Sequence, residues 1–443
     1  MGEVTGRAGL ALLILIASLA PLSAQEVPLS LAQALDLAQQ HNPEILAQRA
    51  RTEAEAARAQ AVKRTSWPRL SLTSGWSRSN TPALVFAQKL NSGDFTQDDF
   101  AIDRLNSPEA LSHLTTTLLA EVPVDAFGAV KARAEAQSST GRAGEEQAGE
   151  SVQDLRLRVV EAYRRAALSQ RVVDVAERAL ASARAREADM EARVGEGASL
   201  RADLLRVRAR RRQREADLAE RRADSEVALA MLSRALGTDP PVSYRPTELA
   251  SEPPPLAGDA PSWQSRALTN RPSLRMAVER LKAQNWSLRA EERASWPELA
   301  AWGQLQDDRS GLSSGGQSGA FGVLLRWKVL DPTRGKRVAA AAAEVHAADL
   351  EVRASRDQVR LEVETAWRRA RSSRDRYAAA AGGAEEGREA LRVVQERRQQ
   401  GMATLTDELE TEAASLAAEL DELRVATEAS IADAALRRAA GGL

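Results

Sequence analysis

The 443-residue sequence contains no cysteine, which excludes disulfide bonds, thiol chemistry and a lipid anchor on an N-terminal cysteine. Histidine occurs three times, at positions too scattered for a cluster of metal ligands: His41, His113 and His346. The sequence has no phosphate-binding loop, nucleophile elbow or metalloprotease motif. We therefore expect no catalytic residue, no metal site and no cofactor, and we predict that the protein is not an enzyme.

Aromatic residues are scarce, at 4%, whereas charged residues make up 28% of the chain. A composition dominated by alanine, arginine and glutamate is typical of long helices that pack through small side chains. The formal net charge is −1, so the chain offers no net basic surface to the phosphates of a nucleic acid. A nucleic-acid partner is not expected.

Long apolar runs are also missing, apart from a short one near the N-terminus. Arg7 precedes an apolar stretch at 10–19, and small residues follow up to Ala24. This order predicts a secretory signal peptide over residues 1–24. A membrane-spanning helix is the alternative, but it needs roughly 20 apolar residues. We therefore expect an exported protein.

One short motif, Ser-Trp-Pro, occurs twice, ending at Pro68 and at Pro297. A helical segment precedes each copy and opens with a proline, Pro43 or Pro272. Both features recur at one offset, because 297 − 68 and 272 − 43 are each 229. Proline cannot continue a helix, so Pro68 and Pro297 should mark joints where a helix becomes a strand. We interpret the pattern as an internal duplication, which decides the architecture.

Each copy has the same order of elements: a helix, a β-hairpin, a long helix, a glycine turn and a return helix. The strands are predicted from alternating apolar residues and the helices from helical spacing. Residues 80–112 and 307–319 are expected to be the loops of the two β-hairpins. The predicted organisation is a first repeat at 25–237 with a β-hairpin at 68–124 and a helical hairpin at 125–236, a proline-rich linker at 238–261, and a second repeat at 262–443 with a β-hairpin at 297–329 and a helical hairpin at 332–440.

The last predicted strand has the clearest pattern. One face is expected to hold apolar residues and the other cations: Phe321, Val323, Leu325, Trp327 and Val329 against Arg326 and Lys328. Each strand has about the 9–11 residues that cross a membrane. A soluble sandwich is the alternative, but no other strand-forming segment is available to pair with these. Four strands cannot close a membrane barrel, whose minimum is about 8, so several chains would have to share one.

These features together resemble the TolC-type outer-membrane efflux family, along essentially all of the chain after the signal peptide. The second glycine turn carries the family's pattern as Gly401, Thr404 and Asp407, and the first carries it in part as Gly197 and Asp203. The resemblance implies a mainly α fold with membrane β-strands. Three identical chains would share one 12-stranded barrel in the lipid of the outer membrane, above the minimum of about 8 strands. Most of each chain would form a periplasmic barrel of helices.

The same resemblance places a periplasmic aperture at the glycine turns. Asp407, Glu410 and Asp203 would line it, and such a ring of carboxylates would favour cations. The alternative is an ordinary helix start, which prefers acidic residues near its N-terminus. Ala403 stands where a member of the resembled family has an arginine that locks the entrance, so we expect the resting entrance to conduct more readily than in members that have this arginine.

We therefore expect a passive exit duct of an efflux or type I secretion system, with a periplasmic adaptor and an inner-membrane pump as partners. Two alternatives remain. A periplasmic adaptor would carry one helical hairpin inserted in small β domains, and an exported coiled-coil structural protein would not need the strands. The cargo is chosen largely by the pump, so the sequence does not name it.

Overall fold

The computed structural model describes residues 27–238, 244–250, 252–310 and 315–443, so the predicted signal peptide at 1–24 lies outside the described residues. The chain forms two compact units, each built from separate stretches. No described helix is both long and apolar enough to cross a membrane. Unit 1 comprises Met1–Pro43, Leu155–Pro255 and Ala370–Ala434, and unit 2 comprises Glu44–Asp154, Leu256–Arg369 and Ala435–Leu443.

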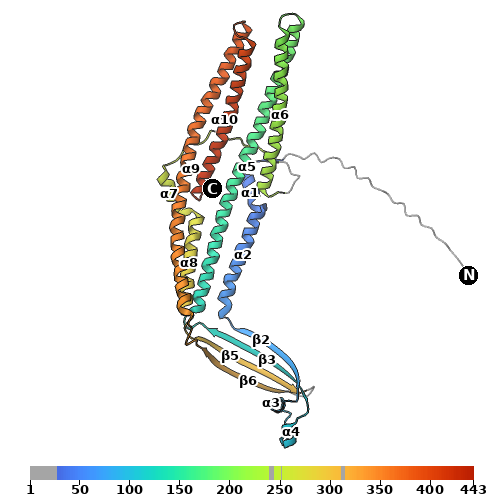
Figure 1. The fold of residues 1–443 in the computed structure, drawn as a ribbon, viewed down its shortest axis with the longest axis vertical. Helices are drawn as coiled ribbons and strands as arrows, with labels where there is room; N and C mark the ends of the chain where they lie inside the picture. Colours follow the sequence, from blue (N-terminus) through green and yellow to red (C-terminus); the bar gives the residue numbers. More distant parts are fainter. Residues whose placement is uncertain (1–26, 239–243, 251, 311–314) are drawn as a thin grey trace, which may run out of the picture. The chain divides into compact units, whose positions relative to one another are not determined.

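Unit 2 contains a four-stranded antiparallel sheet (Figure 1). The strand order is β2-β3-β5-β6, so β2 and β6 form the two edges. The central pair joins the two sequence repeats, with Leu118 opposite Leu305. The duplication therefore yields one continuous sheet. Its strands are β2 (Arg69–Ser79), β3 (Leu111–Val124), β5 (Glu298–Ser310) and β6 (Gly316–Arg326).

The Ser-Trp-Pro motif ends a helix in the same way in both copies. In each motif the tryptophan N–H donates to the C=O three residues earlier at 3.0 Å. The serine hydroxyl also donates to the C=O three residues earlier, at 3.1 Å in both copies. A strand begins directly after each proline, at Arg69 and at Glu298. The predicted joints at Pro68 and Pro297 therefore lie between a helix and a strand.

Helices make up most of both units, and the two longest, α5 and α9, contribute residues to each unit. Alanine-rich stretches favour helix, and the glycine turns end the long helices. The helices outside the β2–β3 connection are α1 (Leu31–His41), α2 (Pro43–Lys63), α5 (Ala129–Gly195), α6 (Arg201–Leu236), α7 (Ala260–Asn270), α8 (Pro272–Arg293), α9 (Arg334–Gln399) and α10 (Leu405–Ala439).

A buried arginine links the connection between α7 and α8 to three other helices of unit 2. Arg271, between α7 and α8, is 3% exposed. Its guanidinium donates to Glu150 of α5 at 2.8 Å and to Glu362 of α9 at 2.7 Å. It also donates to the C=O of Ala439, at the end of α10, at 2.8 Å. Because a buried charge without partners is costly, these bonds hold the connection between α7 and α8 against α5, α9 and α10.

Unit 1 is organised around a buried tyrosine. Tyr163 of α5 is fully buried, and its hydroxyl donates to the C=O of Leu29 at 2.8 Å. The same oxygen accepts the N–H groups of Thr247 and Glu248, each at 3.1 Å. These bonds hold a small parallel sheet of β1 (Val27–Leu29) and β4 (Tyr244–Pro246). The predicted linker at 238–261 therefore includes a strand, and its last residues already belong to α7.

The predicted loop at 80–112 is also wrong in part. It contains α3 (Pro82–Ser92), the 3-10 helix η2 (Gln97–Phe100) and α4 (Ile102–Asn106). These helices are short, so their spacing gave too weak a signal against the surrounding polar residues and prolines. In the second hairpin, β5 continues to Ser310 and the predicted loop at 307–319 is shorter.

The predicted strand at 320–329 extends too far. β6 ends at Arg326, which lies opposite Glu298, the first residue of β5. The residue before Glu298 is Pro297, whose nitrogen carries no hydrogen, so the ladder stops there. The indole nitrogen of Trp327 instead donates to the C=O of Ser295 at 3.1 Å. Trp327, Lys328 and Val329 therefore lie beyond the strand, although the alternation of residue types continues through them.

Candidate functional site

The two glycine turns of unit 1 share one backbone geometry. Gly197 has a φ of 74° and Gly401 a φ of 75°, in the left-handed region that favours glycine. In each turn the glycine N–H donates to the C=O three residues earlier, and the following N–H donates to the C=O five residues earlier. These bonds satisfy the last carbonyls of α5 and α9 and reverse the chain.

The second turn starts α10 with reciprocal hydrogen bonds. The hydroxyl and the N–H of Thr404 both donate to Oδ2 of Asp407, at 2.7 and 2.9 Å. The N–H of Asp407 donates back to the Thr404 hydroxyl at 3.1 Å. This arrangement is a capping box. The bonds from the Thr404 hydroxyl and N–H hold the pKa of the exposed Asp407 below its usual value. Asp407 therefore stays ionised, and its contacts are those of a helix start.

The other predicted aperture residues lie at the same two turns. Glu410 is exposed on α10, three residues after Asp407, so both carboxylates lie on one helix surface. Asp203 lies in the first turn of α6, with Arg206 of the same helix at 3.9 Å. Ala403 is partly buried beside Thr404. The structure thus brings Asp407 and Glu410 together on one turn and places Asp203 on the other.

Sequence reasoning missed a buried acid at the second turn. Glu408 is 6% exposed and forms ion pairs with Arg398 of α9 and Arg186 of α5. Arg186 also pairs with Glu412, one helical turn further along α10. Both arginine side chains are about a fifth exposed, at 23% for Arg398 and 19% for Arg186. These ion pairs connect the second helical hairpin to the first.

An apolar contact accompanies the ion pairs. Leu405 packs against a cluster formed by Met190, Leu204 and Val207 of the first hairpin. Leu405, Glu408 and Glu412 are three and four residues apart, so they share one face of α10. That spacing is the signal that could have singled out Glu408. Its two arginine partners lie on other helices, however, and no local pattern identifies them.

The sheet of unit 2 has one apolar face and one polar face. The strand register places Phe321, Val323 and Leu325 on one face and Arg326 on the other, as predicted. Apolar residues of β2 share the first face and are exposed in the single chain. The exposed apolar residues of this face include Leu70, Leu72, Trp76, Leu305, Phe321, Val323 and Leu325.

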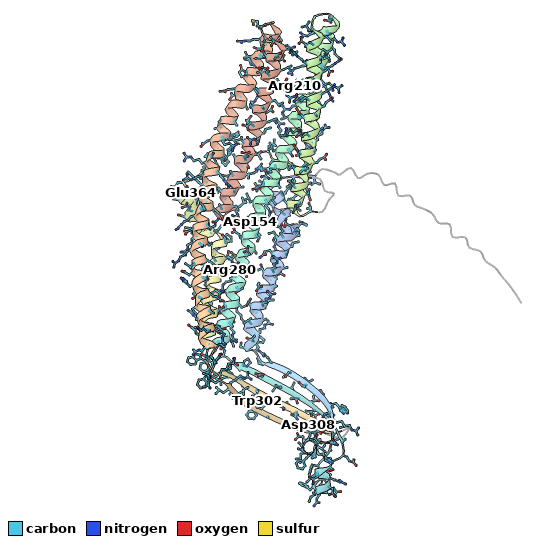
Figure 2. All side chains as sticks on the ribbon, in the orientation of Figure 1. Asp154, Arg210, Arg280, Trp302, Asp308 and Glu364 are labelled. Atoms are coloured by element: carbon cyan, nitrogen blue, oxygen red, sulfur yellow. The ribbon has the colours of Figure 1, made fainter. Side chains whose placement is uncertain are left out.

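The polar face contains a buried histidine–aspartate pair near the end of the sheet (Figure 2). Nε2 of His113 lies 2.9 Å from Oδ1 of Asp308, and both residues are at most 2% exposed. Thr115 donates to the same oxygen at 2.8 Å, and Gln306 donates to Oδ2 at 2.6 Å. Every carboxylate oxygen of Asp308 is therefore satisfied within the sheet.

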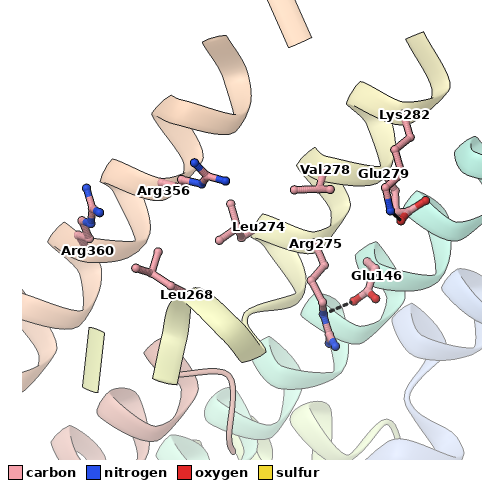
Figure 3. A pocket seen from close by; sticks show the side chains of 9 residues that line it. All are labelled: Glu146, Leu268, Leu274, Arg275, Val278, Glu279, Lys282, Arg356 and Arg360. Carbon is pink, nitrogen blue, oxygen red and sulfur yellow. Dashed lines mark hydrogen bonds and ion pairs between the residues drawn. The ribbon is translucent and has the colours of Figure 1, made fainter. Parts of the chain in front are cut away.

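Unit 2 also has a groove between α8 and α9 (Figure 3). Leu268, Leu274 and Val278 give it an apolar floor. Three of its four cations are paired with carboxylates: Arg275 with Glu146 at 3.1 Å, Lys282 with Glu279 at 2.6 Å and Arg360 with Asp357 at 3.3 Å. This charge pattern is that of a solvated helix surface. Among the described residues, no group of three or more His, Cys, Asp or Glu could hold a metal ion.

Comparison with known proteins identifies the family. The family model described as "Outer membrane efflux protein" matches residues 34–238 and 263–442. A membrane protein of known structure from Pseudomonas aeruginosa is 22% identical, with a TM-score of 0.77 and 93% of each chain covered. The CmeC outer membrane channel of Campylobacter jejuni is 16% identical, with a TM-score of 0.77, over 93% of this chain and 85% of that one. The outer membrane protein VceC of Vibrio cholerae is 18% identical, with a TM-score of 0.74, over 93% and 96%. No curated protein sequence matches the chain.

The two matched segments cover most of the chain and follow its duplication. The predicted fold class is confirmed: the chain is mainly α and internally duplicated, with long helical hairpins and a four-stranded antiparallel sheet. The match also decides against a periplasmic adaptor and against a coiled-coil structural protein. The chain belongs to the outer membrane efflux protein family, whose members are channels of the outer membrane and not enzymes.

Proposed function

We propose that this channel is the exit duct of a tripartite efflux or type I secretion system. Cargo would pass through it passively from the periplasm to the exterior. Three copies would form the duct, and a periplasmic adaptor and an inner-membrane pump would deliver cargo and energy. One observation carries the proposal: the four-stranded sheet has an exposed apolar face and two unpaired edges, β2 and β6.

The unpaired edges argue for a shared barrel. The N–H and C=O groups of an edge strand cannot remain unpaired in hydrocarbon, so the sheet must close. Four strands are below the minimum of about 8, whereas three copies supply 12. β2 and β6 each have 11 residues, so the edge of one copy matches the edge of the next in length. The exposed apolar face would then contact lipid and the polar face would line the lumen.

Chemical crosslinking of the detergent-solubilised protein tests this assembly. The expected product is a covalent trimer, with no species above it as the crosslinker concentration rises. A protein that remains a monomer under the same conditions would remove the shared barrel and, with it, the duct.

We also propose that the glycine turns, with Gly197, Gly401 and Thr404, form the periplasmic entrance, lined by Asp407, Glu410 and Asp203. The shared surface of Asp407 and Glu410 on α10 supports this. Neutralising both, as Asp407→Asn with Glu410→Gln, should lower cation selectivity in single-channel recordings without preventing trimer assembly. Asp421→Asn, further along α10, is the control. Unchanged selectivity would mean that these acids only cap the helix.

Ala403 has no charged side chain that could hold the entrance closed. The resting entrance should therefore conduct more readily than in family members with an arginine at this position.

The two repeats, proposed at 25–237 and 262–443, have the same order of elements, so both joints would lie at the same height in the duct wall. Pro68 and Pro297 would mark the boundary between periplasmic helices and membrane strands. Trp67 is 62% exposed and Trp296 is 54% exposed, and tryptophan favours the membrane interface. Quenchers attached to lipid headgroups should therefore reduce tryptophan fluorescence at both positions. Fluorescence that does not respond at either position would contradict this level.

A further inference from the structure

The connection between β2 and β3 folds into an ordered module. We call residues 82–106 the outer module; they comprise α3, η2 and α4. Lys89 of α3 pairs with Asp99 of η2 at 2.6 Å. Phe95 contacts the rings of Phe86 and Phe100 edge to face, with centroid distances of 4.8 and 5.1 Å. The module therefore holds its own shape and is not an open loop.

The outer module lies on the polar face of the sheet. Only two residues, Asn80 and Thr81, separate β2 from α3, so α3 starts at the end of the sheet. Nε2 of Gln88 donates to the hydroxyl of Ser77 at 3.3 Å. In the register, Ser77 lies opposite His113, on the face that also carries Asp308. Figures 1 and 2 show α3 at the sheet end where Asp308 lies.

The packing of α3 on the sheet is close. Val85, Gln88 and Ser92 are its buried residues, at most 7% exposed. At the edge strand, a Cβ atom on Gly316 would lie 1.9 Å from the C=O oxygen of Asn91, so only glycine allows this approach. The strand residues around the sheet centre are mostly exposed or half-exposed, whereas His113 and Asp308 are buried at this end. The module is thus seated on the polar face by side-chain and backbone contacts.

We propose that the outer module is a gate that folds into the outer mouth of the channel. This rests on the proposed trimeric duct, in which the polar face lines the lumen and the end away from the Ser-Trp-Pro joints is the outer end. Each of three copies then places one α3 helix inside the mouth. A helix with side chains is about 10–12 Å wide, and barrels of about 8 strands are filled by side chains whereas 16–18 strands leave an open channel. Three helices therefore restrict a 12-stranded lumen strongly.

Thiol labelling from outside intact cells tests the gate, because the chain has no cysteine of its own. Thr73→Cys introduces a thiol on the polar face of β2, further from the outer end than Ser77. Leu72→Cys, on the apolar face, is the matched control. Each is treated with a small charged methanethiosulfonate and with a polyethylene glycol maleimide too large for a partly blocked mouth. The small reagent should label position 73 and not position 72.

Two further variants, built in the Thr73→Cys background, decide between an open and a gated mouth. One replaces residues 82–106 with a short Gly-Ser linker; the other keeps the chain length and carries Val85→Ser with Gln88→Ala. Both should react several-fold faster with the bulky maleimide, with little change for the small reagent. Ile102→Ala, at a position that is 74% exposed, should change neither rate.

The outcomes separate the gate from the duct. If the small reagent fails to reach position 73, or labels position 72 equally, the proposed lumen itself is wrong. If the small reagent behaves as expected but the bulky reagent reacts equally fast with and without the anchors, the gate is overturned. If the deletion variant does not assemble, the Val85→Ser with Gln88→Ala variant decides alone, by the same two criteria.

Discussion

The first glycine turn, at Gly197, and the second, at Gly401, occupy equivalent positions of the duplication, because each joins the long helix of its repeat to the return helix; they lie 204 residues apart. Their φ angles differ by one degree, and the same pattern of hydrogen bonds closes both turns. The side chains that follow have diverged. At the same offset, Leu200 corresponds to Thr404, and Leu204 corresponds to Glu408.

The side chains that differ make different contacts in the two turns. Leu200 is 71% exposed and makes no capping bond, whereas Thr404 caps α10. Leu204 is 9% exposed in an apolar cluster, whereas Glu408 is 6% exposed between two arginines. Glycine therefore sets the path of the backbone in both turns, whereas the side chains packed around it can be apolar or ionic. Apolar contacts are non-directional, whereas a buried carboxylate is destabilised when any one of its charged partners is lost.

The largest expected effect comes from placing a charge in the apolar turn. Leu204→Glu places a carboxylate in the apolar cluster with Met190 and Val207 and should cost about 3–5 kcal/mol. Hydrogen exchange of the amides at the start of α6 should speed up accordingly. Leu205→Glu is the control, because Leu205 is 56% exposed and points to solvent. Equal effects in the two variants would show that the first turn has no apolar core.

The reverse change, in the ionic turn, should be somewhat smaller. Glu408→Gln keeps the shape but removes the charge facing Arg398 and Arg186, and should cost roughly 2 kcal/mol. The arginines are partly exposed, so water compensates for part of the loss. Combining Glu408→Gln with Arg398→Ala should cost less than the sum of the single changes. Strict additivity, or an equal effect of Glu410→Gln on exposed Glu410, would contradict the ion-pair account.

The glycines themselves should respond identically. A Cβ atom at Gly197 or Gly401 meets no other atom within 4 Å, so Gly→Ala acts only through the left-handed backbone. Each change should cost about 1–2 kcal/mol. Hydrogen exchange in the last turns of α5 and α9 gives both values in one experiment. A clear difference between the two would mean that the backbones are less alike than their φ angles indicate.

The capping residue should have the smallest effect. Thr404→Ala removes the two bonds between the hydroxyl and Asp407 and should cost about 1 kcal/mol, whereas Leu200→Ala should cost less. Leu200→Thr should instead stabilise the start of α6, because Asp203 occupies the position of Asp407. Amide exchange in the first turn of each helix measures these changes. No gain in Leu200→Thr would show that the apolar turn cannot form a capping box.

The cap also predicts a dependence on pH. The folded-state pKa of Asp407 is lowered, so its stabilisation is complete at pH above the ordinary value of 3.8 and is lost as pH falls through the lowered pKa. Protection of the amides at the start of α10, corrected for intrinsic exchange, should decrease over that range. The Thr404→Ala variant should show a smaller decrease, since its Asp407 keeps the bond from the backbone N–H of residue 404 but loses the bond from the hydroxyl.

Several features could be predicted because they are local or repeated. The Ser-Trp-Pro motif predicted both joints, since a proline cannot continue the interior of a helix. Alternation identified β6 up to Arg326, and the glycines identified both turns. The failures are features that depend on distant partners. The extent of β6 is set by Pro297 on another strand, β4 exists only because β1 pairs with it, and Glu408 is buried by arginines of α5 and α9.

The two open edges of the sheet have a consequence for biogenesis. In a single copy, β2 and β6 are edge strands, each hydrogen-bonded to one neighbouring strand. An exposed strand edge is a template for pairing with any other strand. If the sheet closes with other copies as proposed, this part of the protein reaches its final state only by association, and its stability follows mass action as in obligate oligomers. In the proposed trimer, dilution should weaken this part, and a copy without its two partners would need protection from wrong pairings. Insertion, folding and assembly of the proposed barrel would then be one process.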